Sequence, residues 1–138
     1  SFATYATHDH APLAALWEDF RAGMDSLDED AREGARWNLR VLSEFAGIPL
    51  AKDAESFPPY GEEVQWKLLK ALFESNSRYA AIMITDLFGM TERINIPATV
   101  GGANWALRMP FTVEEMGRRD DLQDEAMKLR ILIADTRR

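Results

Sequence analysis

The sequence has 138 residues, of which 46% are apolar and 28% charged, so it fits one folded domain or a piece of a larger one and excludes wholesale disorder. It contains no cysteine, which excludes a disulfide framework and a thiolate metal site, and we expect a cytoplasmic location. The net charge of -7 makes nucleic acid a poor partner, and no run approaches the roughly 18 apolar residues of a membrane span, so we expect neither partner.

The chain opens with residues typical of a strand. Residues 2–7 (FATYAT) are small, β-branched or aromatic, which predicts a short buried strand. Because the chain has neither an initiator Met nor a signal pattern at its start, we expect a piece that begins inside a larger protein. Pro12 suits a first helical turn, and the apolar residues after it keep helical spacing through Arg21.

Two further helices are expected in the middle of the chain. Residues 26–29 have the spacing of a capping box, which predicts a helix that starts near residue 27 and stops at Gly47. Its later apolar face would comprise Trp37, Val41, Leu42 and Phe45. Residues 47–61, with three prolines, should form a loop. A third helix would open at two glutamates, 62–63, end near residue 75, and bury Val64, Leu68, Leu69, Leu72 and Phe73.

The last part of the chain combines a strand signal, a long loop and a helix. Residues 79–85 form a continuous apolar run, which predicts a strand covered on both faces. Residues 86–111 hold several glycines and prolines with little periodicity, and we expect a long functional loop. A second capping box at residues 112–115 predicts a helix with a break near residue 119 and a buried stripe of Leu122, Ala126, Leu129 and Ile133.

This order of elements predicts a parallel crossover, because a buried strand, helices and a second buried strand follow one another. Two strands cannot form a sheet with both faces covered. Either further strands lie outside this chain, or the chain packs as a mainly α-helical body with two short parallel-type strands.

A carboxylate directly follows the first predicted strand. Residues at the carboxyl ends of strands in parallel α/β folds point into the site, and Asp9 occupies such a place. It could accept hydrogen bonds from sugar hydroxyls and stabilise positive charge that develops at a ring carbon. Alternatively, Asp9 or His10 caps the helix that follows.

A second set of polar residues lies at the start of the long loop and within it. Thr85 and Asp86 end the second predicted strand, and Arg93 and Asn95 occupy alternate positions, which extended backbone would place on one face. Arg and Asn can read hydroxyls, and an indole can stack on a pyranose face; further along, the loop holds Asn104, Trp105 and Arg108. Alternatively, Arg93 pairs with an acid, Asn95 holds the loop, and the indole belongs to the core.

His8 and His10 flank Asp9 and could present two imidazoles together. A metal site usually needs three or four ligands, and the chain has no third His and no Cys, so we expect no metal. The sequence contains no phosphate-binding glycine loop and no nucleophile-elbow serine, so it holds no complete catalytic constellation.

Three segments together resemble one enzyme family. Residues 5–9 (YATHD) resemble its seventh-strand motif, T-H-D, and residues 84–89 (ITDLFG) resemble its eighth strand with the following turn. Residues 93–97 (RINIP) and 102–108 (GANWALR) resemble its R-x-N-x-P and G-x-N-W-x-x-R signature. The family is the amylomaltase-type 4-α-glucanotransferases, also called disproportionating enzymes. The resemblance covers nearly the whole chain, but only the C-terminal portion of the family's catalytic barrel.

The resemblance implies a fold, a site and a reaction. Residues 1–138 would be a single C-terminal segment of an α/β (β/α)8 TIM barrel. Asp9 would be the catalytic carboxylate that stabilises the transition state, and substrate would be bound by His8, Arg93 and Asn95. The enzyme would transfer segments between α-1,4-glucans or maltooligosaccharides by retaining double displacement, without a cofactor.

The resemblance also implies what this chain lacks. In the family, the nucleophile and the acid/base lie on earlier strands, and no acidic residue precedes Asp9 here, so the isolated chain should be inactive. Its broken barrel face predicts self-association, and Trp105 would pack under the loop. Two alternatives stay open: a non-catalytic helical interaction or sugar-binding module, and an HD-type helical metallohydrolase prompted by His8 and Asp9.

Overall fold

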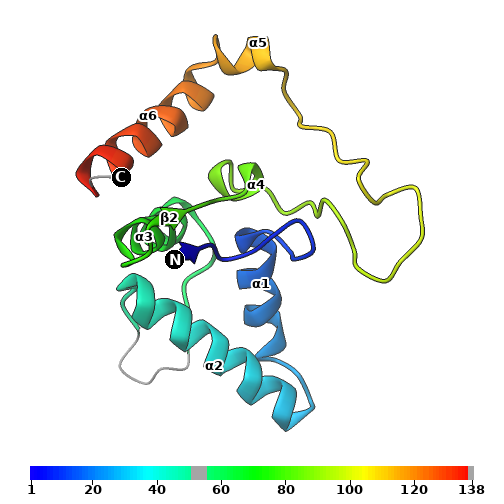
Figure 1. Ribbon diagram of the computed structural model, residues 1–138. Coiled ribbons are helices and arrows are strands. Elements are labelled where there is room, and N and C mark those ends of the chain that lie inside the picture. Colours follow the sequence, from blue (N-terminus) through cyan, green and yellow to red (C-terminus); the bar gives the residue numbers. More distant parts are fainter. Residues whose placement is uncertain (51–55, 137–138) are drawn as a thin grey trace.

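The computed structural model describes residues 1–50 and 56–136. Its elements, in chain order, are β1 (Phe2–Ala3), α1 (Leu13–Gly23), α2 (Glu29–Ala46), α3 (Glu62–Glu74), β2 (Tyr79–Ala80), α4 (Ile84–Leu87), α5 (Val113–Met116) and α6 (Asp120–Asp135). Figure 1 shows α1, α2 and α3 forming a lower body, with α5 and α6 above it and a long loop to one side. The predicted loop at residues 47–61 lies partly outside the described residues.

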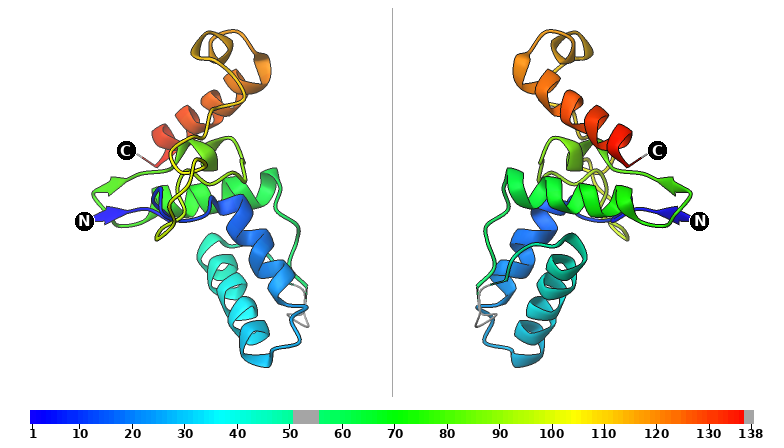
Figure 2. Two further views of the ribbon diagram at one scale, coloured as in Figure 1. Left: turned by 90° about the vertical axis from the view of Figure 1, so that its right-hand side faces the viewer. Right: turned by 90° about the vertical axis from the view of Figure 1, so that its left-hand side faces the viewer.

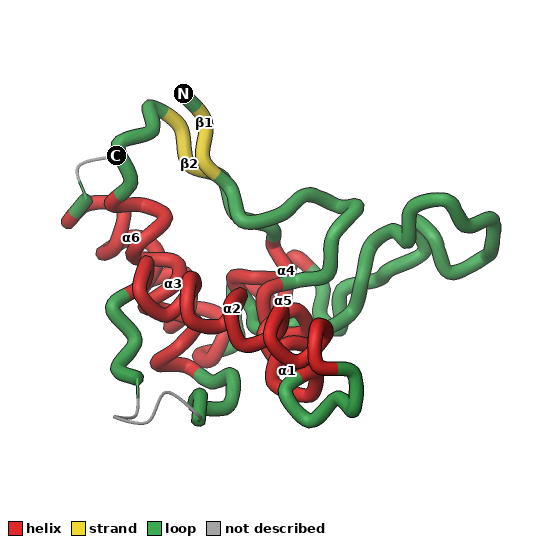
Figure 3. Tube along the Cα trace, turned by 90° about the horizontal axis from the view of Figure 1, so that it is seen from below, coloured by secondary structure: helices red, strands yellow, loops and turns green. Residues whose placement is uncertain are grey.

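β1 and β2 form a parallel pair in which Phe2 lies opposite Tyr79 and Ala3 opposite Ala80. This pairing confirms the predicted parallel crossover, and Figure 3 shows the two strands side by side at one end of the molecule. Both strands are shorter than predicted, and the predicted burial is wrong, since Phe2 is 64% exposed. A pair of strands with no neighbouring strand among the described residues cannot cover both of its faces.

The last two residues of the predicted second strand, 84 and 85, are helical, and residues 81–83 form neither a helix nor a strand. Residues 84–87 form α4, and the carboxylate of Asp86 is buried there at 2% exposure. Gln65 of α3 fixes this turn, because its Nε2 donates hydrogen bonds to the main-chain oxygens of Asp86 and Leu87, at 3.2 and 2.8 Å. An apolar run of this length suits a buried helical turn as well as a strand, and the hydrogen bonds from α3 favour the helix.

The start of α1 is capped from a distant part of the chain. Pro12 occupies the N-cap position and makes no side-chain cap. The main-chain N of Leu13 instead donates a 2.7 Å hydrogen bond to Oδ1 of Asp86. This bond satisfies one of the N–H groups that have no partner within the first turn of a helix. The alternative in which Asp9 or His10 caps this helix is therefore wrong.

α2 begins at Glu29, two residues later than predicted, because Asp28 and not Ser26 is its N-cap. The Asp28 carboxylate accepts hydrogen bonds from two main-chain N–H groups of the first turn, while the Ser26 hydroxyl accepts one from the main chain of Asp28 itself. The predicted stop is confirmed. Gly47 has a φ of 61°, a left-handed conformation that glycine adopts without steric cost.

The predicted apolar face of α2 is confirmed only at Leu42, which is partly buried against the core, and is wrong at Trp37, Val41 and Phe45. Its buried residues are Ala35, Leu39 and Ser43, whereas Trp37 is 64% exposed and Phe45 is exposed as well. Two positions along a helix correspond to about 200° of rotation, so the covered stripe lies nearly opposite the predicted one. α2 therefore presents an apolar stripe to solvent.

α3 lies in the centre of the core, and its predicted buried side is confirmed by Val64, Leu68, Leu69, Leu72 and Phe73. Trp17 of α1 and Leu39 of α2 belong to the same cluster. The hydroxyl of Tyr5 donates a 2.6 Å hydrogen bond to the main-chain O of Leu68. This bond attaches the segment after β1 to α3. It thereby fixes where the following turn, which contains Asp9, begins.

The C-terminal helices largely follow the prediction. α5 begins with the expected capping box between Thr112 and Glu115, and α6 follows after the expected break. Leu122 and Leu132 of α6 are buried but Ala126 is exposed, so the predicted stripe is confirmed only in part. Figure 2 shows α6 above the body, and Figure 1 shows the chain from residue 88 to 112, which has no helix or strand, extending to one side as a long loop.

Candidate functional site

Asp9 lies in a tight turn that follows β1. The main-chain N of His10 donates a 2.9 Å hydrogen bond to the main-chain O of Thr7, and the main-chain N of Asp9 donates one to Thr7 Oγ1 at 3.4 Å. The His10 ring also contacts Thr7, since its Nδ1 accepts from the Thr7 main-chain N at 3.4 Å. The turn therefore engages His10 locally and leaves the Asp9 side chain 45% exposed.

The predicted site residues of the two segments meet. Asn95 Nδ2 donates a 2.7 Å hydrogen bond to Oδ1 of Asp9, and the guanidinium of Arg93 donates one of 3.0 Å to the main-chain O of Asp9. These contacts join residues that lie 84 and 86 positions apart in the sequence. Arg93 and Asn95 thus both reach Asp9, and they lie on one side of the segment, as their alternate spacing predicted. The hydrogen-bond partner of Arg93 is a carbonyl and not an acid, so that alternative is wrong.

His8 lies on the same side of the turn. Its Nε2 is 3.4 Å from Oδ1 of Asp9, and its ring contacts the indole of Trp105, with the ring centroids 4.7 Å apart and the planes tilted by 45°. The His8 side chain is 49% exposed. The structure therefore brings together all four predicted site residues, His8, Asp9, Arg93 and Asn95, and adds Trp105 as a neighbour.

Thr85 and Asp86 do not belong to this group. Both are buried, and Asp86 serves the start of α1 through Leu13. Burial raises the pKa of Asp86 above its ordinary value, and hydrogen bonds from the main chain at Leu13 and Met83 oppose that rise. No local sequence signal could have indicated this structural role, since Asp86 lies 73 positions from Leu13.

The long loop is held by Asn104. Its Oδ1 accepts a 3.0 Å hydrogen bond from the main-chain N of Ile96, and its Nδ2 donates to the main-chain O and the hydroxyl of Thr99, at 3.1 and 2.9 Å. Arg108 is exposed. The prediction that Trp105 packs under the loop is wrong, because its side chain is 65% exposed.

The geometry around Asp9 suits a polar ligand. Oδ1 faces Asn95 and His8, while Oδ2 has no hydrogen-bond partner within residues 1–50 and 56–136. A carboxylate oriented in this way can accept hydroxyl hydrogen bonds and can stabilise positive charge on a sugar ring. Among the described residues, no group of three or more His, Cys, Asp or Glu side chains could hold a metal ion.

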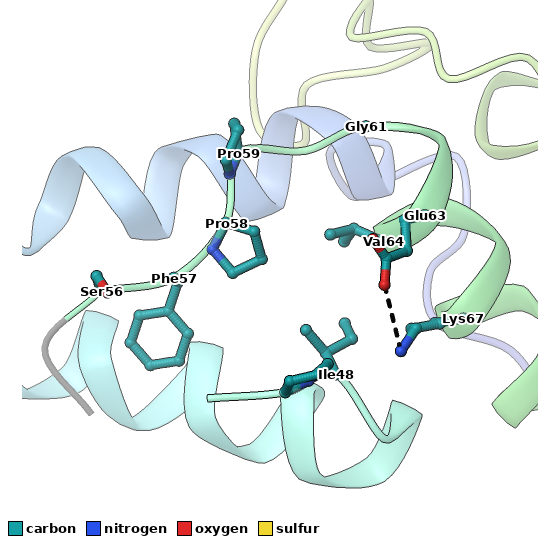
Figure 4. Close-up of a pocket in the computed structure, with 10 residues that line it drawn as sticks. Ile48, Ser56, Phe57, Pro58, Pro59, Gly61, Glu63, Val64 and Lys67 are labelled. Carbon is teal, nitrogen blue, oxygen red and sulfur yellow. Dashed lines mark ion pairs between the residues drawn. The ribbon is translucent and has the colours of Figure 1, made fainter. Parts of the chain in front are cut away.

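The pocket in Figure 4 lies apart from these residues. It has a volume of about 580 Å³ and lies between residues 56–59 and the start of α3. Phe57 and Val64 contribute apolar walls, and Glu63 and Lys67, an ion pair of 3.4 Å, also line it. None of the four predicted site residues lines this pocket, so it is not the predicted site.

Comparison with known proteins identifies the family. The model of the 4-alpha-glucanotransferase family matches residues 1–113, a span that contains β1, β2, the turn with Asp9 and the long loop. The chain belongs to this family. The resemblance inferred from the motifs is therefore confirmed, and an HD-type metallohydrolase is no longer a candidate.

Individual relatives agree with the family match. The chain is 24% identical over 132 residues to a 4-alpha-glucanotransferase of Chlamydia muridarum, an alignment that covers 88% of this chain and 21% of the relative. Its fold is similar to that of an amylomaltase from Streptococcus agalactiae in complex with acarbose, with a TM-score of 0.62 at 18% identity. That match covers all of this chain and 22% of the other. The chain thus spans about a fifth of the length of these relatives.

The comparisons bear on the predicted fold class at a coarse level. The chain has the fold of one part of an amylomaltase, and it is mainly helical with two short parallel strands, as predicted. The complete barrel stays a proposal. No helix in the described part of the chain combines the length and apolar character that crossing a membrane requires.

Proposed function

We propose that this chain is part of a 4-α-glucanotransferase that transfers segments between α-1,4-glucans such as starch, glycogen or maltooligosaccharides. The observation that carries this proposal is the 2.7 Å hydrogen bond between Asn95 and Asp9, which joins two motifs of the family-matched span. In this function, Asp9 grips hydroxyls of the donor sugar and stabilises the oxocarbenium-like transition state. His8, Arg93 and Asn95 bind the same sugar or orient the carboxylate that does.

The reaction is a retaining double displacement. A carboxylate nucleophile forms a glycosyl-enzyme while a carboxylic acid protonates the leaving oxygen, and a second glucan then takes the sugar in place of water. No acidic residue precedes Asp9 in this sequence, so we assign both of these groups to the part of the relatives that the chain does not match. The isolated chain then binds glucan without turnover.

Exposed apolar surface supports a larger barrel. Trp37, Val41 and Phe45, here called the α2 stripe, are all exposed, and so are Phe2 and Tyr79 on the strand pair. Surfaces of this kind mark interaction sites in soluble proteins. We assign them to contacts with further strands and helices of a (β/α)8 barrel, and the isolated chain then associates with itself through them.

Titration with maltoheptaose tests the proposed function. We expect the chain to bind the oligosaccharide, and Asp9→Asn and Asn95→Ala to weaken binding by about tenfold or more, since a hydrogen bond to a charged group contributes about 1.5–3 kcal/mol. Asp19→Asn, which alters an exposed carboxylate of α1, is the matched control and should leave binding unchanged.

Two outcomes count against this function. Equal affinities in the wild type and Asp9→Asn would remove Asp9 from the site. A second experiment measures transfer activity after the chain is joined to the preceding part of a family member. In this joined protein, Asp9→Asn should abolish transfer. Binding that depends on Asp9 with no transfer in the joined protein would favour the non-catalytic sugar-binding module.

A further inference from the structure

Trp105 has two features that core packing does not explain. Its side chain is 65% exposed, and its φ of 59° places it in the left-handed region, which a bulky residue rarely adopts. Backbone conformations of this kind persist only where surrounding contacts fix them, and they are concentrated at functional sites. The conformation of Trp105 therefore requires a structural cause and suggests a role.

The structural cause is the closure of the long loop. The main-chain N of Trp105 donates a 2.8 Å hydrogen bond to the main-chain O of Ile94, and the neighbouring Asn104 binds Ile96 and Thr99. These bonds bring the two ends of residues 94–105 together. We call this closed segment the 94–105 loop.

The two ends of the 94–105 loop contact two adjacent residues of the turn after β1. At one end, Asn95 donates to the carboxylate of Asp9, and at the other end the indole of Trp105 contacts the ring of His8. One closed loop therefore orients the carboxylate and the imidazole together. Neither contact requires a ligand.

We propose that Trp105 is a positioning residue that holds the His8 imidazole beside Asp9 for glucan binding. This role rests on the proposed function. The His8 ring lies 4.7 Å from the Trp105 indole, between ring centroids, and its Nε2 lies 3.4 Å from Oδ1 of Asp9. Without the indole, a half-exposed imidazole would sample several rotamers, and ordering it on binding would weaken affinity.

Proton NMR tests the placement of His8 in the chain as it exists. The sequence has two histidines, so two Cε1–H signals are expected, and His10→Gln assigns them. The ring current of an indole 4.7 Å away should displace the His8 signal from its value in the unfolded chain. Trp105→Leu should abolish that displacement, and Trp105→Phe, which keeps an aromatic ring, should retain part of it.

A matched control removes a different exposed indole. Trp37→Leu, on α2, should leave both histidine signals in place. The amide spectrum of each variant shows whether the fold is intact, since only signals near the 94–105 loop should move in Trp105→Leu. A His8 signal that is the same in the wild type, Trp105→Phe and Trp105→Leu overturns the placement.

Maltoheptaose separates this role from the proposed function. It should move the His8 signal in the wild type and bind Trp105→Leu about threefold or more weakly, as expected for the loss of an aromatic pair, with Trp105→Phe between the two. Equal affinities for the wild type and Trp105→Leu would overturn the positioning role. Absence of any response in the wild type would instead overturn the proposed function, while the ring-current comparison would still test where His8 lies.

Discussion

Asp86 offers the sharpest test of how the fold is held together. Its buried carboxylate accepts the 2.7 Å hydrogen bond from the main-chain N of Leu13, which is itself buried at the start of α1. Asp86→Ala removes this acceptor and leaves a donor without a partner or water. An unsatisfied buried group costs about 1–3 kcal/mol, so we expect the free energy of unfolding to fall by about 2 kcal/mol.

Asp86→Asn separates the acceptor from the charge. The amide keeps an oxygen for Leu13 but cannot ionise. Because burial raises the pKa of Asp86 in the folded chain above its ordinary value of 3.8, the folded chain binds this proton more tightly than the unfolded chain does. The stability due to that raised pKa is complete below pH 3.8 and is lost as the pH rises through the folded value. Asp86→Asn should therefore become more stable relative to the wild type as the pH rises.

Urea unfolding at micromolar concentration, followed by tryptophan emission, measures both effects, since unfolding exposes the buried Trp17. The wild type and both variants are compared at several pH values between 4 and 8, and Asp19→Asn serves as the exposed control. Comparing variants at each pH cancels the contribution of the other carboxylates. The role given to Asp86 is refuted if Asp86→Ala is as stable as the wild type, or if the difference between Asp86→Asn and the wild type is independent of pH.

Three further predictions concern the α2 helix and the long loop. Gly47→Ala should lower the free energy of unfolding by about 1 kcal/mol in urea titrations, because φ is 61° at this position, and an equal stability would contradict the left-handed cap. Trp37→Ser combined with Phe45→Ser should shift the chain toward monomer in sedimentation experiments, while Glu44→Gln, an exposed change on the same helix, should not. Asn104→Ala should increase amide exchange across residues 94–105 by removing three hydrogen bonds, and unchanged exchange there would show that Asn104 does not hold the loop.

The sequence predicted those elements whose signals are local. The left-handed stop at Gly47 and the capping box at Thr112 each depend on residues within one turn of each other, and both are confirmed. The buried side of α3 is also confirmed, because its apolar residues keep helical spacing and share one core cluster with residues of α1 and α2. Local capping residues and a single stripe of apolar residues are sufficient to predict the ends and the buried side of such helices.

Other elements could not be predicted because the deciding contact is distant. The cap of α1 comes from Asp86, 73 positions away, and nothing near Leu13 indicates it. The run that leads into α4 is apolar whether it forms a strand or a helix, and Gln65 of α3 decides between them. α2 carries two candidate faces, and only the position of its neighbours shows that Leu39 is covered and Trp37 is not.

The site illustrates both situations. The meeting of Asp9 with Arg93 and Asn95 could be predicted, because the segments that leave two neighbouring parallel strands emerge at the same edge of the sheet, and the motifs indicated the residues. The place of Trp105 could not, since an indole in a loop is compatible with the core and with the surface. Its exposure follows from a hydrogen bond between Trp105 and Ile94 that closes the 94–105 loop and turns the ring toward His8. The motifs therefore named Trp105 but not the place of its ring, which depends on contacts that only the structure shows.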